Sequence, residues 1–264
     1  MIQYVDIDFN SSGTTTINMV REDVHNAFDD VMIAQLISAF KQAQEDKQTR
    51  VIVLRSNGKN FSAGADLNWM RSMATKNYQE NMDDAAVLAS LMHLIATCPK
   101  PTIALVQGAA FGGAVGLVAC CDIAIATPRA SFCLSEVKIG LIPAVISPYV
   151  VNAMGQRQAQ RYFLTAERFN ATKALEFGLV HEVNDDLDSA LAPIIDALLN
   201  NSPGAMAQAK ELISYVANEN ITQQLIHGTS ERIAAIRVST EGQEGLSSFL
   251  EKRVPNWIAG DNNV

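Results

Sequence analysis

The sequence has few of the residues that build disulfide scaffolds or metal centres. Its four cysteines, Cys98, Cys120, Cys121 and Cys133, include no C-x-x-C pair, and two of them are adjacent in an apolar run. Such cysteines are typical of buried thiols in a reducing compartment. The four histidines are scattered and lack the spacing of metal ligands. We therefore expect neither a disulfide framework nor a metal site.

Long hydrophobic runs and basic runs are missing as well. No apolar run reaches the roughly 18 residues that a membrane-spanning helix needs, and residues 1–8 lack the basic and apolar parts of a signal peptide. The 28 acidic residues outnumber the 20 basic ones, and the net charge of −8 disfavours nonspecific binding to nucleic-acid phosphates. We expect a cytoplasmic protein with no membrane or nucleic-acid partner. A local basic pocket for a small anionic ligand is compatible with this charge.

Length and composition indicate a globular protein with one main domain. Its 264 residues are near the upper limit for a single hydrophobic core, and 48% hydrophobic with 18% charged residues is ordinary for such a chain. We predict a core domain over residues 1–195 and a helical C-terminal region over residues 196–264.

Short apolar runs that alternate with helical patterns predict an α/β fold built from βαβ units around a parallel sheet. The first two strands are expected to form a hairpin. The expected strands lie at residues 4–9, 14–20, 50–55, 102–107 and 122–127. The expected helices lie at residues 26–46, 78–96 and 114–121, and then, in an almost entirely helical stretch from residue 185, after Ser202 and at 222–238 and 241–252.

The most informative segment is the glycine-rich stretch Gly108–Gly116, between an expected strand and an expected helix. Glycines at a helix start leave backbone N–H groups bare, admit a ligand closely and favour negative charge. Such a turn suits a phosphate, or an oxyanion that forms during a reaction. Its spacing is not the dinucleotide-binding pattern G-x-G-x-x-G. Tight packing of the strand against the helix is the alternative explanation for the glycines.

A second loop of small residues, Phe61–Leu67, also follows an expected strand and precedes an expected helix. If the two strands are neighbours, each loop can supply one N–H to the same carbonyl oxygen and so form an oxyanion hole. Taken alone, a loop of this kind is also a common connector.

Glu136 is a single carboxylate in the mostly apolar segment Phe132–Pro143. A carboxylate buried among such residues has a raised pKa and can exchange protons near neutral pH. The alternative is a carboxylate at a helix N-terminus, with Ser135 as the cap. The residues alone leave both interpretations open.

Together these segments resemble the crotonase (enoyl-CoA hydratase/isomerase) superfamily. The resemblance covers residues 2–257, and its ordered motifs are specific for the superfamily. They are Asn26-Ala27, Ala63–Asp66, Gly108–Gly116 with Cys121–Ile123, Ser135–Pro143, Leu164–Glu167, Ala174–Val183 and Phe249–Pro255. The resemblance implies a spiral of ββα units with a C-terminal helical region for trimerisation, and a homotrimer or dimer of trimers.

The resemblance also implies an acyl-CoA substrate, with coenzyme A as part of that substrate and no separate cofactor. The oxyanion hole would consist of the N–H groups of Ala65 and Gly113, and Glu136 would carry the proton chemistry. The other residues that the resemblance places around the substrate and its CoA are Val24, Ala63, Asp66, Leu67, Gly112 and Gly116.

One position departs from the familiar hydratases of this superfamily, which carry two glutamates. The first belongs where this chain has Gly116, and the second matches Glu136. A single glutamate there resembles the enoyl-CoA isomerases. However, four segments resemble bacterial methylglutaconyl-CoA hydratases of leucine breakdown: Asn68–Met70, Val115–Asp122, Ser135–Tyr149 and Arg161–Glu167.

We therefore expect a hydratase-type lyase that adds water to a branched or carboxylated α,β-unsaturated acyl-CoA. The alternative within enzymes is a Δ3,Δ2-enoyl-CoA isomerase that uses the same glutamate. The alternative outside enzymes is a non-catalytic relative that binds CoA or RNA, because some members of the superfamily bind RNA.

Overall fold

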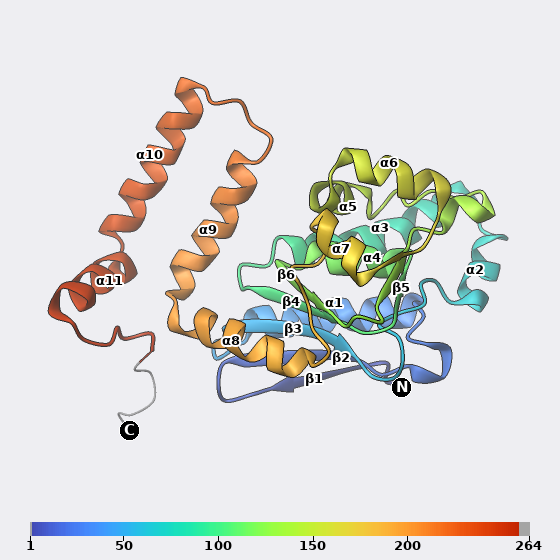
Figure 1. The fold of residues 1–264 in the computed structure, drawn as a ribbon, viewed down its shortest axis with the longest axis horizontal. Coiled ribbons are helices and arrows are strands. Elements are labelled where there is room, and N and C mark those ends of the chain that lie inside the picture. The colour runs from blue at the N-terminus through green and yellow to red at the C-terminus, as the bar shows by residue number, and fades with distance from the viewer. Residues whose placement is uncertain (1, 259–264) are drawn as a thin grey trace.

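The structure, a computed structural model, describes residues 2–258 as an α/β body followed by helices at the C-terminus (Figure 1). The larger sheet has the strand order β1-β2-β3-β4-β6-β9, and the smaller sheet has the order β5-β7-β8. The strands of the larger sheet are β1 (Val5–Phe9), β2 (Thr14–Met19), β3 (Val51–Ser56), β4 (Thr102–Val106), β6 (Ile123–Ala126) and β9 (Glu182–Val183). Those of the smaller sheet are β5 (Ala109–Phe111), β7 (Ser131–Cys133) and β8 (Phe169–Asn170).

The helices follow the strands in the alternating order that the sequence predicts. In the body they are α1 (Asp30–Glu45), α2 (Leu67–Met73), α3 (Tyr78–Ala96), α4 (Gly113–Cys120), α5 (Ser147–Met154), α6 (Gln156–Thr165), α7 (Ala171–Phe177) and α8 (Leu187–Asn200). The C-terminal arm consists of α9 (Pro203–Val216), α10 (Gln223–Val238) and α11 (Thr240–Glu251). Two short 3₁₀ turns, η1 (Glu22–Val24) and η2 (Glu136–Ile139), lie next to the loops described below.

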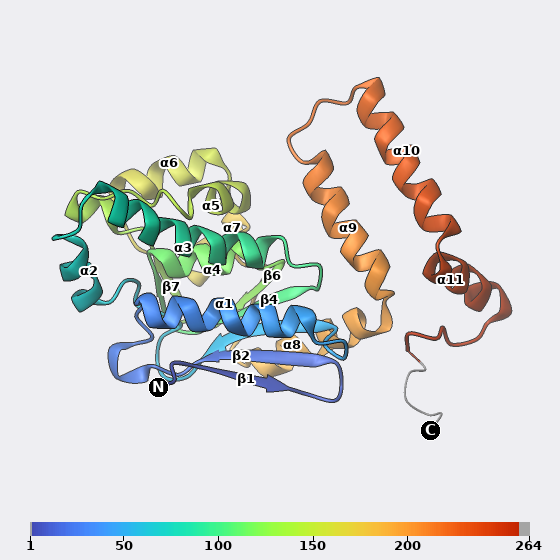
Figure 2. The same cartoon turned by 180° about the vertical axis from the view of Figure 1, so that it is seen from behind.

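The central strands β3, β4 and β6 are covered on both faces of the larger sheet, which explains why they are mostly apolar. Side chains alternate along a strand, so Ile52 and Leu54 of β3 join the core with α1 and α3, whereas Val51 and Val53 pack against α8. Figures 1 and 2 show α1 and α3 on one face of this sheet and α8 on the other. The predicted hairpin and parallel sheet are confirmed, because β1 pairs with β2 antiparallel and the pairs from β2 through β9 are parallel.

The C-terminal arm stands beside the body (Figures 1 and 2). Lys210 of α9 ties it to the body through Asp122, with a distance of 2.6 Å between Nζ and the carboxylate oxygen. Within the three arm helices only Ser248 is buried. The arm therefore has apolar surface that the single chain does not cover.

Three details differ from the sequence-based expectation. The first helix was expected from residue 26 but begins at Asp30, because Asn26 has a left-handed φ of 54° and its side chain binds the carbonyls of Asn57 and Asn60. Part of the glycine-rich stretch forms strand β5 and pairs with β7. The expected division at residue 195 falls inside α8, which packs on the sheet and continues to Asn200.

Candidate active site

The two small-residue loops lie side by side, because β3 and β4, the strands that they follow, are parallel neighbours. Three backbone hydrogen bonds join the loops. The N–H of Phe61 donates to Gln107 at 2.7 Å, the N–H of Ser62 to Ala109 at 3.0 Å, and the N–H of Phe111 to Ser62 at 3.1 Å. The condition for a shared oxyanion hole, loops from adjacent strands, is therefore met.

Ala65 and Gly113 each present a bare backbone N–H. Within residues 2–258 neither N–H has a hydrogen-bond acceptor, and the Ala65 residue is exposed. Gly113 is the first residue of α4, where an N–H has no partner inside the helix and the helix dipole attracts negative charge. These two donors have the properties needed to bind an oxyanion.

Phe28 connects the two donors. Its N–H donates to Gly64 at 2.8 Å and its carbonyl accepts from Asp66 at 2.7 Å, so it brackets Ala65 in a parallel β-bridge. A Cβ atom at Gly113 would lie 3.5 Å from the Phe28 ring. The same residue thus fixes the loop that carries Ala65 and packs beneath Gly113.

Gly64 allows the two loops to approach each other. Gly64 and Gly112 both have positive φ values, 96° and 54°, which residues with a side chain rarely adopt. A Cβ atom at Gly64 would lie 3.0 Å from the carbonyl oxygen of Phe111. A side chain at Gly64 would therefore push the loops, and with them the bare N–H groups, apart.

Glu136 places its carboxylate against the glycine turn. A Cβ atom at Gly112 would lie 3.2 Å from Oε1 of Glu136, and Oε2 is buried with no hydrogen-bond partner in the described part of the chain. Burial raises the pKa of Glu136 above its usual value. A buried carboxylate oxygen without a partner is costly, so its presence against the turn that precedes Gly113 points to a reaction rather than to stability.

The alternative role for Ser135 is not supported. Glu136 does begin a short 3₁₀ turn, η2, but the Ser135 side chain makes no capping hydrogen bond there. Of this alternative, the position of Glu136 at the start of a helical turn is present, whereas a hydrogen-bonded Ser135 cap is not. The turn ends at Gly140, which has a left-handed conformation.

Gly116, expected beside the substrate, lies in tight helix packing. It is buried within α4, and a Cβ atom there would lie 2.2 Å from Cγ2 of Ile146 and 3.3 Å from Cε of Met92. A glutamate cannot fit at this position while Ile146 is present. The structure thus explains physically why a second carboxylate is missing.

The residues expected around CoA surround the Ala65 loop. Val24 lies in η1, Ala63 donates its N–H to the His25 carbonyl at 3.0 Å, and Leu67 is 70% exposed at the start of α2. Asp66 caps α2 by accepting hydrogen bonds from the N–H groups of Asn68 and Trp69. Its carboxylate is occupied within the protein, and its N–H and carbonyl are engaged with Phe28 and Met70.

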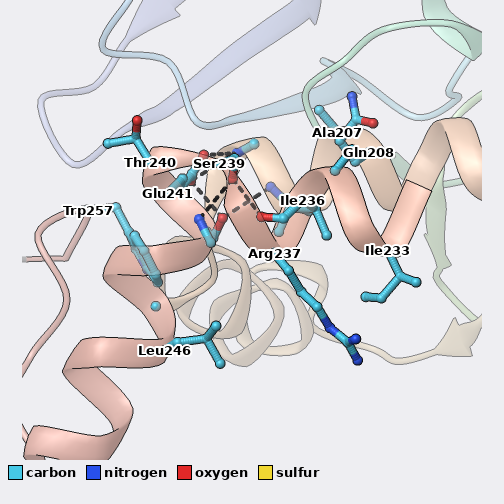
Figure 3. A pocket seen from close by; sticks show the side chains of 16 residues that line it. Ala207, Gln208, Ile233, Ile236, Arg237, Ser239, Thr240, Glu241, Leu246 and Trp257 are labelled. Atoms are coloured by element: carbon cyan, nitrogen blue, oxygen red, sulfur yellow. Dashed lines mark hydrogen bonds between the residues drawn. The ribbon is translucent and has the colours of Figure 1, made fainter. Parts of the chain in front are cut away.

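A large cavity lies away from this chemistry. It measures about 850 Å³ and lies among the arm helices and Trp257 (Figure 3). Glu241 in its wall is already bound, since it accepts from Oγ of Ser202 at 2.6 Å and from the N–H of Gly204 at 3.0 Å. The bare donors and the unpartnered carboxylate, rather than cavity size, therefore identify the candidate site.

The sequence analysis proposed the two donors and Glu136. It did not single out Phe28, which holds the Ala65 loop, or Ile146, which packs against Gly116. The residue pattern placed Phe28 only as one apolar position of a helix. Nothing local in the sequence connects Ile146 with Gly116. Within residues 2–258 no cluster of acidic, histidine and cysteine side chains could hold a metal ion, and none of the helices has the length and apolar character of a membrane span.

Comparisons with known proteins identify the family of the chain. The family model described as enoyl-CoA hydratase/isomerase matches residues 10–260. A crystal structure of an enoyl-CoA hydratase from Shewanella pealeana superimposes with a TM-score of 0.95 at 58% identity, over 97% of this chain and 96% of that one. Enoyl-CoA hydratase AKT6-1 of Alternaria alternata is 32% identical over 92% of this chain and 80% of its own length.

An isomerase also appears among the relatives. The mitochondrial Delta(3,5)-Delta(2,4)-dienoyl-CoA isomerase of Dictyostelium discoideum is 28% identical over 96% of this chain and 90% of its own length. The family thus contains both types of reaction. On its fold, its ordered motifs and the match over nearly its whole length, the chain belongs to the enoyl-CoA hydratase/isomerase family, the crotonase superfamily.

Proposed function

We propose that the protein is an enoyl-CoA hydratase that works with a single glutamate, Glu136. The observation that carries the proposal is the Glu136 carboxylate. Its Oε1 lies beside Gly112 and its Oε2 is buried without a hydrogen-bond partner in the described residues, while Gly113 and Ala65 present bare N–H groups on the two joined loops. This arrangement joins a proton-exchanging group to two oxyanion donors, which is what addition of water to an enoyl thioester requires.

In the proposed reaction the thioester oxygen accepts hydrogen bonds from Ala65 and Gly113. Glu136 takes a proton from water, and the oxygen of that water forms a bond to Cβ of the substrate. The electrons of the double bond move to the thioester oxygen, where the two N–H groups stabilise the enolate. Protonated Glu136 then gives its proton to Cα, which restores the carbonyl and the ionised carboxylate. The balance is one water added across the double bond.

The substrate that we propose is a branched or carboxylated enoyl-CoA similar to methylglutaconyl-CoA. The support is the resemblance of Val115–Asp122 and Ser135–Tyr149 to hydratases of leucine breakdown. Val24, Ala63, Asp66 and Leu67 are the proposed CoA contacts, and their shared position around the Ala65 loop is consistent with that role. No cofactor other than the CoA of the substrate enters this mechanism.

A Δ3,Δ2-enoyl-CoA isomerase is the second candidate. It is favoured by the single carboxylate, because moving one proton between C2 and C4 requires only one base. The same two donors would stabilise the same type of enolate. The steric exclusion of a side chain at Gly116 by Ile146 is the observation behind this alternative.

Product analysis with crotonyl-, methylglutaconyl- and 3-enoyl-CoA distinguishes the candidates. A hydratase yields a 3-hydroxyacyl-CoA, and an isomerase yields only a shifted double bond. We expect hydration, fastest with the methylglutaconyl substrate. Binding of all three without turnover would contradict both enzymes and support a non-catalytic CoA-binding relative. A salt-sensitive gel shift with RNA at physiological ionic strength would support the RNA-binding alternative.

We also propose that the protein assembles as a homotrimer or a dimer of trimers through the C-terminal arm. The support is that the arm helices bury only Ser248, while Val238, Phe249 and Leu250 are at least 76% exposed. Exposed apolar surface of this kind is typical of association sites. Light scattering that gives the mass of one chain would contradict the proposal.

A further inference from the structure

Arg21 is the most highly connected cation near the candidate site. Its guanidinium lies 3.0 Å from the Asp29 carboxylate and 3.0 Å from the Asp66 carboxylate, and it donates to the Ala27 carbonyl at 2.8 Å. It also stacks 4.4 Å from the centre of the Tyr4 ring. Only 12% of the Arg21 side chain is exposed, so these contacts are shielded from water.

The two carboxylates flank the bridge that holds Ala65. Asp29 follows Phe28 and Asp66 follows Ala65, and Phe28 and Ala65 are the two partners of the β-bridge. One planar guanidinium therefore holds both sides of the bridge together. A lysine ammonium lacks the forked geometry that this requires.

Both carboxylates are also fixed from the opposite side. Asp29 caps α1 by accepting from the N–H of Met32, and Asp66 caps α2. Burial acts to raise the pKa of Asp66, but the backbone N–H groups of Trp69 and Asn68 and the charge of Arg21 outweigh it, and the net pKa is lowered. Asp66 is thus held ionised and in one orientation, directly after the residue whose N–H must be aimed.

We propose that Arg21 is a positioning residue for the reaction: by clamping Asp29 and Asp66 across the Phe28–Ala65 bridge, it aims the Ala65 N–H at the thioester oxygen. This inference rests on the proposed function, because it assumes that Ala65 is an oxyanion donor. A donor displaced by a fraction of an ångström loses much of its effect on the transition state while the substrate still binds.

The test uses Arg21→Lys and Asp66→Asn. Asparagine retains the ability to cap α2 but loses its charge, and lysine retains the charge but loses the fork. In both variants we expect kcat to fall about 10- to 100-fold with little change in KM. The matched control is Asp84→Asn. Asp84 is a half-buried carboxylate of α3 that pairs with Lys76 and lines a polar cavity together with Arg21, Asp29 and Asp66, but it is not part of the bridge. The control should retain kcat.

A spectroscopic measurement separates positioning from simple stability. A conjugated aryl-enoyl-CoA bound in a Glu136→Gln background should show a red-shifted absorption band, because the two N–H donors polarise its carbonyl. Arg21→Lys or Asp66→Asn in that background should reduce the shift. Folded variants that retain wild-type kcat and the full red shift, or that change KM alone, would contradict the proposed positioning role of Arg21.

Failure of the clamp and failure of the proposed function give different results. If the wild-type protein turns over none of the three enoyl-CoA substrates, the proposed function fails, yet the band position of the bound probe still reports whether Arg21 affects the oxyanion donors. If the wild-type protein is active and the band position does not depend on Arg21, only the clamp fails.

Discussion

Glu136 and Gly116 differ in what the chain places at a site shielded from water. At Glu136 the chain retains an ionisable group with no partner in the described residues, although burial disfavours its charge. At Gly116 it retains no side chain at all, and Ile146 fills the space. Positions selected for stability alone are packed like the second, not the first. The difference indicates that the chemistry of this protein is assigned to one carboxylate.

Replacing Glu136 should have the largest effect on activity. Glu136→Gln retains the shape of the side chain and removes its ability to exchange protons, so kcat should fall about 10²- to 10⁴-fold. Steady-state kinetics on the best enoyl-CoA substrate measures the loss, and an unchanged circular dichroism spectrum verifies the fold. Hydration at nearly the wild-type rate would show that the reactive group lies elsewhere.

Placing a side chain at Gly116 should have the largest effect on stability. Gly116→Ala puts a carbon 2.2 Å from Ile146, and Gly116→Glu adds a buried charge. We expect losses of about 1–3 kcal/mol for alanine and more for glutamate. Chemical denaturation measures them.

Combining Gly116→Ala with Ile146→Ala tests the origin of that loss. The smaller side chain at 146 removes the clash, so the double variant should lose less than the sum of the single variants. Strict additivity would mean that Ile146 is not what excludes a side chain at position 116.

The raised pKa of Glu136 predicts the response to pH. As a base Glu136 must be ionised, so kcat/KM should fall on the acid side with a midpoint above the ordinary value of 4.5. Glu167→Gln is the matched control, because the Glu167 carboxylate lies at the surface and hydrogen bonding from Arg161 lowers its pKa. It should leave the midpoint unchanged. A wild-type midpoint at or below 4.5 would contradict the assignment.

The same shift has a consequence for stability. The folded protein binds the Glu136 proton more tightly than the unfolded chain, so this group destabilises the fold progressively as pH rises from the unfolded to the folded pKa. Glu136→Gln should therefore have a higher Tm than the wild type at neutral pH. The gap should close in acid, where Glu136 is protonated in both states. A constant gap across this range would contradict the raised pKa.

Shortening the Ile146 side chain should have the smallest effect on stability. Ile146→Val removes one methyl from a fully packed position and should cost about 1 kcal/mol of stability. Leu164→Ala is the control, since Leu164 is 77% exposed and its truncation should change little. Equal losses in the two variants would mean that the packing around Gly116 is not tight.

Much of the body could be predicted from local patterns. The first four residues of β3, Val51–Leu54, are apolar because both faces are covered, and helix α3 begins after Asn77, whose capping box lies in the sequence itself. Proximity of the two small-residue loops followed from their position after successive parallel strands. In each of these cases the determining residues are neighbours along the chain.

What could not be predicted depends on residues distant in sequence. Asn26 leaves the helical conformation because it binds carbonyls of the 57–60 loop, so the first helix starts later than its periodicity suggests. Likewise, Arg21 meets Asp66, and Gly116 meets Ile146, only after the chain has folded. Local propensity contains no information about such contacts.

The interlocking of the two loops limits how this site can change. A Cβ atom at Gly108 would lie 2.0 Å from the carbonyl oxygen of Lys59, and one at Gly64 would meet that of Phe111. The backbone of each loop thus limits which residues the other loop can contain. A mutant library that randomises one loop alone should consist mainly of misfolded chains, whereas new substrate preferences should emerge from libraries that vary the two loops together.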